Sequence, residues 1–84
     1  MSVYVDTMQV PYRGMIMCHM LADSIEELHA MADKIGVSRR WFQTTTVPHY
    51  DICKSTCTLA IKAGAMELTT VRQVAGVMRR AREL

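Results

Sequence analysis

Apolar residues gather at strand length in two stretches near the start of the chain. Residues 3–5 (Val-Tyr-Val) are β-branched and aromatic, which predicts a strand that ends near Asp6. Residues 15–22 form an apolar run of strand length that contains His19. Residues 11–14 (Pro-Tyr-Arg-Gly), which lie between them, have the composition of a turn. We therefore expect the two strands to pair as a hairpin.

The apolar spacing changes to a helical period after Ser24. Ser24 and Glu27 have the capping-box spacing, in which each side chain bonds a free backbone N–H of the first turn. Gly36 is the expected end of the helix, because glycine adopts the left-handed conformation without strain. The sequence thus predicts a helix between Ser24 and Gly36, and its apolar stripe consists of Ile25, Leu28, Ala32 and Ile35.

The second half of the chain is predicted to hold one more strand and two more helices. Residues 37–47 are rich in aromatic and β-branched residues and are predicted to form a strand. A short helix follows over about residues 54–63 and stops at Gly64. Residues 66–68 form either a last short strand or a connector. Thr70 caps the final helix.

The final helix is predicted to be amphipathic. Gly76 lies inside it and costs about 1 kcal/mol relative to alanine, which indicates close packing or a kink at that point. The residues expected to face inward are Val71, Val74, Ala75 and Met78.

The order of these elements, β-β-α-β-α-(β)-α, predicts an α+β fold in which about three helices pack on a short mixed β-sheet. The chain has 84 residues, so residues 1–84 are expected to form a single domain. Half of the residues are apolar and 21% are charged, which excludes a mainly disordered chain and a coiled-coil rod. A core of this size favours dimerisation. We expect a homodimer.

No apolar run is long enough to span a bilayer, and the first residues lack the basic start of a secretory signal. The protein is therefore expected to be cytoplasmic and to have no membrane partner. The sequence contains no C-x-x-C pair, so its three cysteines predict neither a zinc ribbon nor a thioredoxin-type redox site.

Charge is unevenly divided along the chain. Residues 1–36 have a net charge of −3 and residues 37–84 a net charge of +5. Such asymmetry is typical of proteins with an anionic partner, although arginines in the last turn of a helix also stabilise the negative end of its dipole. The basic end consists of Arg72, Arg79, Arg80 and Arg82.

The tripeptide His49-Tyr50-Asp51 combines a proton acceptor, a phenol and a carboxylate just before a predicted helix. Two interpretations remain open for it: a reactive cluster, or a turn with Asp51 as a helix cap. His19 is either a buried, hydrogen-bonded histidine or a pocket residue. For His29, on the edge of a helical stripe, a hydrogen-bonded histidine is favoured over a ligand contact.

Residues 39–42 (Arg-Arg-Trp-Phe) combine two arginines with two aromatic rings, a combination that binds phosphates and stacks bases. Aromatic residues of a small protein also serve as core, and both interpretations remain open. Asp23 is a further candidate, although it competes with Ser24 for the role of helix cap.

Several of these motifs occur together, in fixed order, in one family. They are residues 3–6, 17–23, 26–30, 35–36, 40–43, 49–52 and 64–65. Over about residues 2–68 the chain resembles a small family of bacterial and bacteriophage proteins of unknown function, DUF4031. The resemblance implies that the following are family motif positions: Asp6, His19, Asp23, His29, Trp41, Gln43, His49, Tyr50 and Asp51.

The chain departs from the family pattern at two places. Thr7 stands where the family has a second acidic residue, which weakens a two-carboxylate metal site. Thr56 and Cys57 stand where the family often has a Lys-Arg pair, which removes positive charge from one position that would bind an anion. The resemblance implies a bacterial or phage protein, and for a phage protein the cytoplasm is that of the host.

We expect first a binding module for a small, anionic, nucleotide-like ligand, which it would sequester. Arg39 and Arg40 would supply charge, and Trp41 or Tyr50 would stack on the ligand. The hydrogen-bonding residues would be His29 and Gln43.

The alternative is a phosphoester hydrolase, either a nuclease or a nucleotide phosphodiesterase. Asp6 and Asp23, with Asp51, would hold a divalent metal, and His19 or His49 would act as general acid or base. This function ranks second because so small an enzyme would need another subunit to exclude water. Binding of nucleic acid or protein through the C-terminal arginines ranks third, since a net charge of +2 is modest.

Overall fold

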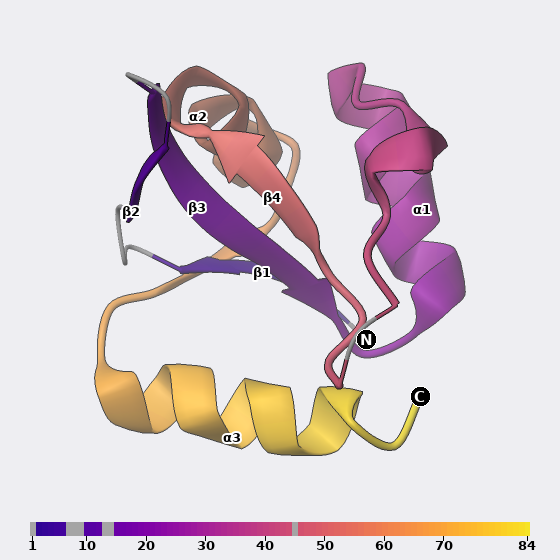
Figure 1. The fold of residues 1–84 in the computed structure, drawn as a ribbon, viewed down its shortest axis with the longest axis vertical. Coiled ribbons are helices and arrows are strands. Elements are labelled where there is room, and N and C mark those ends of the chain that lie inside the picture. The colour runs from indigo at the N-terminus through magenta and orange to yellow at the C-terminus, as the bar shows by residue number, and fades with distance from the viewer. Residues whose placement is uncertain (1, 7–9, 13–14, 45) are drawn as a thin grey trace.

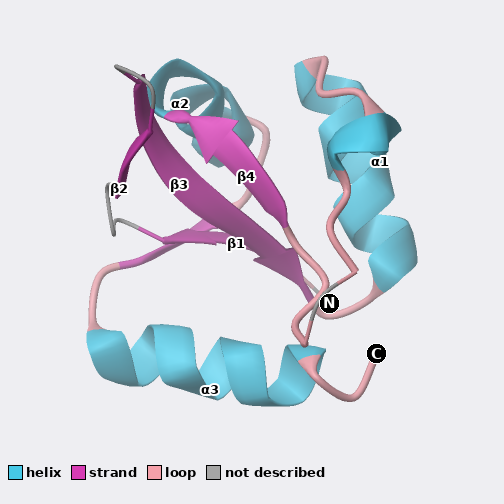
Figure 2. Cartoon of the chain, viewed as in Figure 1, coloured by secondary structure: helices cyan, strands magenta, loops and turns pink. Residues whose placement is uncertain are grey.

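The computed structural model describes residues 2–6, 10–12, 15–44 and 46–84, and it is an α+β fold, as predicted (Figure 1, Figure 2). The strands are β1 (Val3–Asp6), β2 (Val10–Tyr12), β3 (Met15–Ala22), β4 (Tyr50–Cys53) and β5 (Met66–Leu68). The helices are α1 (Ile25–Ile35), the 3₁₀ turn η1 (Arg39–Trp41), α2 (Lys54–Lys62) and α3 (Val71–Ala81).

The long strand β3 organises the mixed sheet. It pairs antiparallel with β1, β2 and β4, and β5 extends the sheet by pairing parallel to β1. The predicted pairing of the first two strands is confirmed, with Val5 opposite Met20. The predicted turn over residues 11–14 is wrong at its start, because Pro11 and Tyr12 belong to β2. Proline is tolerated there since β2 lies at an edge of the sheet. Residues 13 and 14 lie outside the described residues.

Different helices pack on the two faces of the sheet. Alternate residues such as Val5, Met20 and Ile52 point to one face, where they form the main core with α1 and α2. On the opposite face, Leu21 and Leu68 pack against α3. Figure 1 shows α3 crossing below the sheet, apart from α1 and α2. The part of this second face that carries polar residues of β3 and β4 provides the site described below.

The ends of α1 follow from local chemistry. The hydroxyl of Ser24 accepts a hydrogen bond from the backbone N–H of Glu27 at 3.1 Å. The carboxylate of Glu27 accepts from the Ser24 hydroxyl at 2.9 Å, in place of the backbone N–H that a full capping box would use. Gly36 ends the helix in the left-handed conformation at φ 81°. The second helix agrees with its prediction to within one residue.

The strand predicted over residues 37–47 is wrong. Ser38 accepts a hydrogen bond from the backbone N–H of Arg40 and begins η1. Of the described residues in this stretch, only Gln43 makes a bridge, with its backbone paired to that of His49 at 2.9 and 3.1 Å. The free edge of β3 pairs with β4. The aromatic residues of 37–47 therefore pack against the core or line a pocket, and they do not pair with β3. Because His49 makes this bridge and Asp51 lies within β4, the turn-and-cap interpretation of residues 49–51 is also wrong.

The final helix is capped as predicted, but it buries a different face from the one predicted. Thr70 and Gln73 form a reciprocal capping box. Val71, predicted to face inward, is 77% exposed, and Ala75 is exposed as well. Val77 is buried instead. A Cβ added to Gly76 would meet only a side-chain atom of Arg80, at 4.0 Å, so the close packing expected at Gly76 is absent.

Candidate functional site

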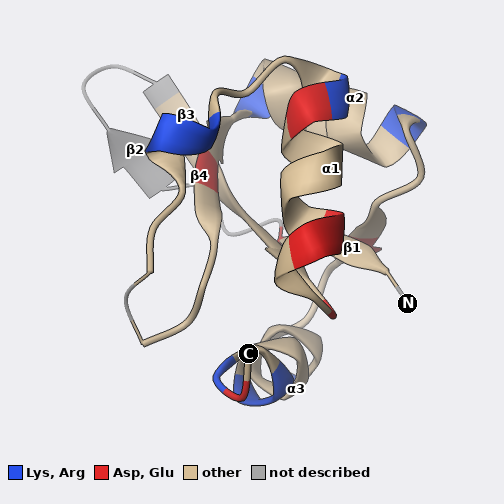
Figure 3. Ribbon diagram, turned by 90° about the vertical axis from the view of Figure 1, so that its right-hand side faces the viewer, with Lys and Arg blue, Asp and Glu red and all other residues tan. Residues whose placement is uncertain are grey.

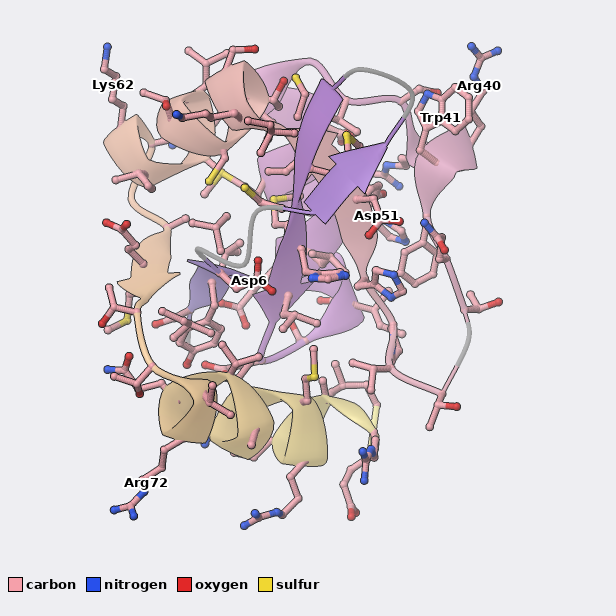
Figure 4. All side chains as sticks on the ribbon, turned by 60° about the vertical axis from the view of Figure 1, so that its left-hand side comes forward. Asp6, Arg40, Trp41, Asp51, Lys62 and Arg72 are labelled. Atoms are coloured by element: carbon pink, nitrogen blue, oxygen red, sulfur yellow. The ribbon has the colours of Figure 1, made fainter. Side chains whose placement is uncertain are left out.

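Strand pairing brings the sequence-predicted polar residues together on one face of the sheet. The antiparallel register of β3 and β4 places His19 opposite Asp51. Asp6, the last residue of β1, lies beside His19 from the other side. In Figure 4, Asp6 and Asp51 lie over the middle of the sheet, with Asp51 on the side nearer Trp41. Three strands thus contribute one polar group each to a continuous patch.

Asp6 and His19 form the most constrained pair of this patch. The Asp6 side chain is fully buried and accepts two hydrogen bonds from His19: one from the backbone N–H at 3.0 Å and one from Nδ1 at 2.8 Å. A carboxylate acceptor fixes the proton of His19 on Nδ1 and leaves Nε2 on the outer side of the ring. The hydrogen bond to Asp6 is also the main reason why the pKa of His19 is raised above its ordinary value.

Asp51 lies between two histidine rings. Its Oδ1 atom is 3.7 Å from Nε2 of His19 and 3.4 Å from Nε2 of His49. Its Oδ2 atom accepts a hydrogen bond from Nε2 of Gln43 at 2.7 Å. The His49 ring donates from Nδ1 to the carbonyl of Val47 at 2.7 Å, and the two imidazole centroids are 5.6 Å apart. Both histidines therefore turn their Nε2 atoms toward the same carboxylate oxygen.

A pocket of about 640 Å³ opens beside this patch, along the outer side of β4. Its wall includes His19, Trp41, Gln43, Asp51, Cys53 and Thr56. The Trp41 side chain is 58% exposed, and it forms part of the rim together with the chain around Gly36. The volume is that of a small-molecule site. The pocket therefore has an aromatic ring at one side and the histidine–aspartate patch at the other.

A family model for a protein of unknown function, DUF4031, matches residues 3–81. The chain belongs to this family. The match confirms the resemblance carried by the sequence motifs and extends it through α3. No curated protein and no solved structure shows significant similarity to the chain. In the described part of this DUF4031 protein, no helix is both long enough and apolar enough to cross a membrane.

Neither of the two adjacent arginines of the DUF4031 chain is among the residues that line the pocket. Arg39 forms a bidentate pair with Asp33, with its Nη2 atom 2.7 Å from the carboxylate. Arg40 lies over the Trp41 ring, with its guanidinium carbon 4.9 Å from the ring centroid. Arg40 thus lies beside the pocket residue Trp41, and Arg39 is held on α1.

His29 and Tyr50, expected to bind a ligand, are in contact within the core. Nδ1 of His29 lies 2.6 Å from the hydroxyl of Tyr50, whose side chain is fully buried. Both rings also pack against Phe42. Neither residue is among those lining the pocket. This arrangement favours the structural interpretation of His29.

Asp6 and Asp23, predicted as a metal pair, are far apart. Asp23 accepts from the backbone N–H of Ser2 at 2.8 Å and from the hydroxyl of Tyr4 at 3.0 Å. Ser2 directly precedes β1 and Asp6 ends it, so the two residues are about 13 Å apart at the usual rise of a strand. Among the described residues, no group of three or more His, Cys, Asp and Glu side chains could hold a metal ion.

Cys53 is a pocket residue that the sequence analysis did not single out. It is the N-cap of α2, and its sulfur lies 3.2 Å from the Ser55 hydroxyl and 3.0 Å from the Thr56 hydroxyl. Hydrogen bonds from Ser55 and then Thr56 lower the pKa of Cys53 to about 7. Burial raises the pKa of Cys57 to about 12. The available signal was a cysteine followed by hydroxyl residues at a helix start.

The C-terminal arginines lie on the outer side of α3. Arg72, Arg79, Arg80 and Arg82 are all exposed. Figure 3 shows basic residues gathered on this helix, and in Figure 4 the Arg72 side chain points away from the sheet. None of the four lines the pocket. A function of these arginines would therefore be separate from that of the pocket.

Proposed function

We propose that this DUF4031 protein is a hydrolase that cleaves a phosphoester bond in a small nucleotide-like substrate. The observation that carries the proposal is the Asp6–His19 pair, in which a fully buried carboxylate fixes the ring of a pocket histidine. A site that only binds a ligand does not need such a pair, whereas proton transfer depends on a fixed tautomer and orientation.

The reaction follows from the position of the free nitrogen of His19. Nε2 takes a proton from water, and the water oxygen forms a bond to phosphorus while the ester P–O bond breaks. The proton held by His19 then passes to the leaving oxygen, so that no proton is gained or lost overall. Asp6 stabilises the imidazolium formed in between, since its carboxylate accepts from Nδ1 at 2.8 Å.

The nucleotide-like character of the substrate is inferred from the opposite side of the pocket. The exposed Trp41 ring offers a stacking surface for a base, and the guanidinium of Arg40 over that ring brings positive charge to the rim. The Gln43 and Asp51 side chains supply hydrogen-bonding groups on the pocket wall.

A binding module without turnover is the second candidate. It is favoured by the same Trp41 and Arg40, which would hold a nucleotide whether or not it is cleaved. In that case the protein would sequester its ligand, and the pocket would release it unaltered. Nucleic-acid binding through the exposed arginines of α3 is a third candidate, independent of the pocket.

A turnover assay tests the first proposal against the second. The purified protein is incubated with bis(p-nitrophenyl) phosphate, a cyclic dinucleotide and short RNA and DNA oligonucleotides, and the products are separated by chromatography. We expect cleavage of at least one substrate, and a fall of about 10²–10⁴-fold in its rate in His19→Ala. Lys62→Ala, an exposed residue of α2 that does not line the pocket, is the control and keeps the wild-type rate.

Two results would overturn the hydrolase. One is tight binding of a nucleotide that is recovered unchanged, which supports the binding module. The other is a His19→Ala variant, shown to be folded by circular dichroism, that cleaves as fast as the wild type.

A further inference from the structure

The positive charge of the chain is concentrated at its last helix. Residues 71–84 contain four arginines and one acidic residue, Glu83, and have a net charge of +3. Residues 1–70 contain six basic and seven acidic residues and have a net charge of −1. The modest net charge of +2 thus combines a short, strongly basic segment with a nearly neutral remainder. The arginines of this segment, here called the α3 arginines, are Arg72, Arg79, Arg80 and Arg82.

The α3 arginines lie on the face of the helix that is turned away from the domain. The buried residues of α3, which define its inner face, are Val74, Val77 and Ala81. At 3.6 residues per turn, Arg72 and Arg79 lie nearly opposite this inner face, about two turns and about 10 Å apart along the helix axis. Arg80 and the C-cap residue Arg82 lie on the two sides of the line that joins them. Figure 3 shows these basic residues gathered on α3, and in Figure 4 the Arg72 side chain points away from the sheet.

The α3 arginines have no partner within the described part of the chain. None of the four guanidinium groups takes part in an ion pair or a hydrogen bond there, whereas Arg39 is paired with Asp33. Like charges on one helix face repel one another. An anion that lies along this face would replace the repulsion by attraction.

The stability of α3 accounts for only part of this charge. Arg79 and Arg80 in the last turn, and Arg82 at the C-cap, lie near the negative end of the helix dipole, which favours cations. Arg72 is the second residue of the helix, where the positive end of the dipole disfavours a cation. The first turn contains no acidic residue that would offset it. An anionic partner accounts for all four arginines, and the dipole accounts for three.

We propose that the α3 arginines bind the phosphate backbone of a double-stranded nucleic acid without sequence preference. Guanidinium groups bind phosphate through two parallel hydrogen bonds, and all the cations of this face are arginines. A duplex has about one negative charge per 1.7 Å of its axis, so several phosphates lie within reach of a line of cations about 10 Å long.

The composition of α3 favours a duplex over a single strand. Proteins that bind single strands stack the bases on aromatic side chains, and α3 contains no aromatic residue. Contacts to phosphate carry no sequence information, so the affinity should be similar for any sequence. This surface goes beyond the proposed hydrolase and does not rest on it, since none of the four arginines lines the pocket.

A membrane surface fits this helix less well than a nucleic acid does. An amphipathic helix that binds a bilayer buries its apolar face among the lipids. The apolar residues Val74 and Val77 of α3 are already buried in the cluster that contains Leu21 and Leu68. They are therefore not available to enter a bilayer, and lipid vesicles serve as the competing ligand in the test.

Duplex binding is measured by fluorescence anisotropy of a fluorescein-labelled 20-base-pair DNA, with a second DNA of scrambled sequence. At 50 mM KCl we expect saturable binding with similar affinity for both sequences. Four neutralised phosphates predict a slope of about −3.6 for log K against log [KCl], which is a loss of affinity of about 100-fold between 50 and 200 mM KCl. An RNA duplex of the same sequence shows which of the two nucleic acids binds more tightly.

Single substitutions on the outer face of α3 test the assignment of the residues. Arg72→Ala and Arg79→Ala are each expected to weaken binding by about ten-fold at 50 mM KCl and to reduce the salt slope by about 0.9. Lys62→Ala is the matched control and is expected to bind as the wild type does, because Lys62 is an exposed cation of α2, on the opposite face of the sheet. Far-UV circular dichroism verifies that each variant is folded.

Three results would overturn the surface. The first is the absence of duplex binding at 50 mM KCl, and the second is full affinity in both arginine variants. The third is displacement of the labelled duplex by phosphatidylserine vesicles as effective as displacement by unlabelled duplex at equal phosphate concentration, which would indicate a membrane surface.

The α3 surface and the hydrolase fail in different ways. Duplex binding that depends on Arg72 and Arg79, together with no cleavage of any phosphoester, supports the surface and removes the hydrolase. Cleavage of bis(p-nitrophenyl) phosphate by a protein that binds no duplex overturns the surface and supports the hydrolase.

Discussion

Replacement of Asp6 by asparagine isolates the interaction on which the site depends. The asparagine side chain fills nearly the same volume as the aspartate. In the wild type the backbone N–H of His19 donates to the Asp6 carboxylate at 3.0 Å, and the Oδ1 atom of asparagine can still accept this hydrogen bond. Its NH₂ group then faces Nδ1 of His19, which must become an acceptor. The proton of the ring moves to Nε2, and the lone pair that faced Asp51 is lost.

The expected loss of stability follows from the bonds exchanged. A hydrogen bond to a charged group contributes about 1.5–3 kcal/mol, and a neutral one about 0.5–1.5 kcal/mol. Asp6→Asn replaces hydrogen bonds to a charged group by hydrogen bonds to a neutral one at a fully buried position, so we expect the free energy of unfolding to fall by about 1–2 kcal/mol. Asp6→Ala leaves both His19 N–H groups without a partner and is expected to lose about twice as much.

Urea unfolding followed by far-UV circular dichroism measures these losses, because the exposed Trp41 is a poor fluorescent probe of the core. Asp33→Asn is the control: it removes an exposed carboxylate that pairs with Arg39, and a loss below about 1 kcal/mol is expected. NMR of the His19 ring gives the tautomer directly. The reasoning would be refuted by an Asp6→Asn variant as stable as the wild type with the His19 proton still on Nδ1.

Two further predictions concern the pocket. In metal-free protein at neutral pH, iodoacetamide should label Cys53 well before Cys57, because the pKa of Cys53 is about 7 and that of Cys57 about 12. Peptide mapping by mass spectrometry measures the labelling of each cysteine. Equal labelling of the two cysteines would contradict this assignment of their pKa values. Trp41→Ala should weaken binding of a nucleoside phosphate by about ten- to a hundred-fold, as expected for one base-stacking contact. Since Trp41 is 58% exposed, its loss should leave the unfolding midpoint unchanged, and calorimetric titration with equal affinity for both proteins would exclude the stacking role.

The elements that local chemistry determines could be predicted from the sequence. The α1 helix depends on Ser24 at its start and Gly36 at its end, and both act within one turn. The β3 strand was recognised by its apolar run, and its bounds agree with the prediction. These signals need no knowledge of the rest of the fold.

The elements that tertiary packing determines were placed wrongly. The fourth strand begins at Tyr50 because the edge of β3 between residues 17 and 20 pairs with residues 50–53, a choice that propensity alone does not reveal. In α3 the apolar residues fit two overlapping faces, and contact with Leu21 and Leu68 selects the one that includes Val77.

The candidate site was only partly predictable for the same reason. His19, Gln43, His49 and Asp51 were identified as candidate site residues, and strand register brings them together. The role of Asp6 as a buried acceptor depends on β1 pairing beside His19. Cys53 was missed because its low pKa arises from hydroxyl groups that only the helix start brings to its sulfur.

The fold itself does not require a polar pair where Asp6 meets His19. On the same face of the sheet, Tyr4 lies opposite Leu21, and both pack in the apolar cluster under α3. A buried carboxylate must recover its lost hydration through hydrogen bonds, whereas an apolar pair at that position would gain free energy from burial alone. The sheet therefore keeps a pair that contributes less to stability than a leucine and a valine would. What the pair provides in return is a histidine ring with a fixed proton and an Nε2 atom directed at Asp51 beside an open pocket, which is the arrangement on which the proposed hydrolase depends.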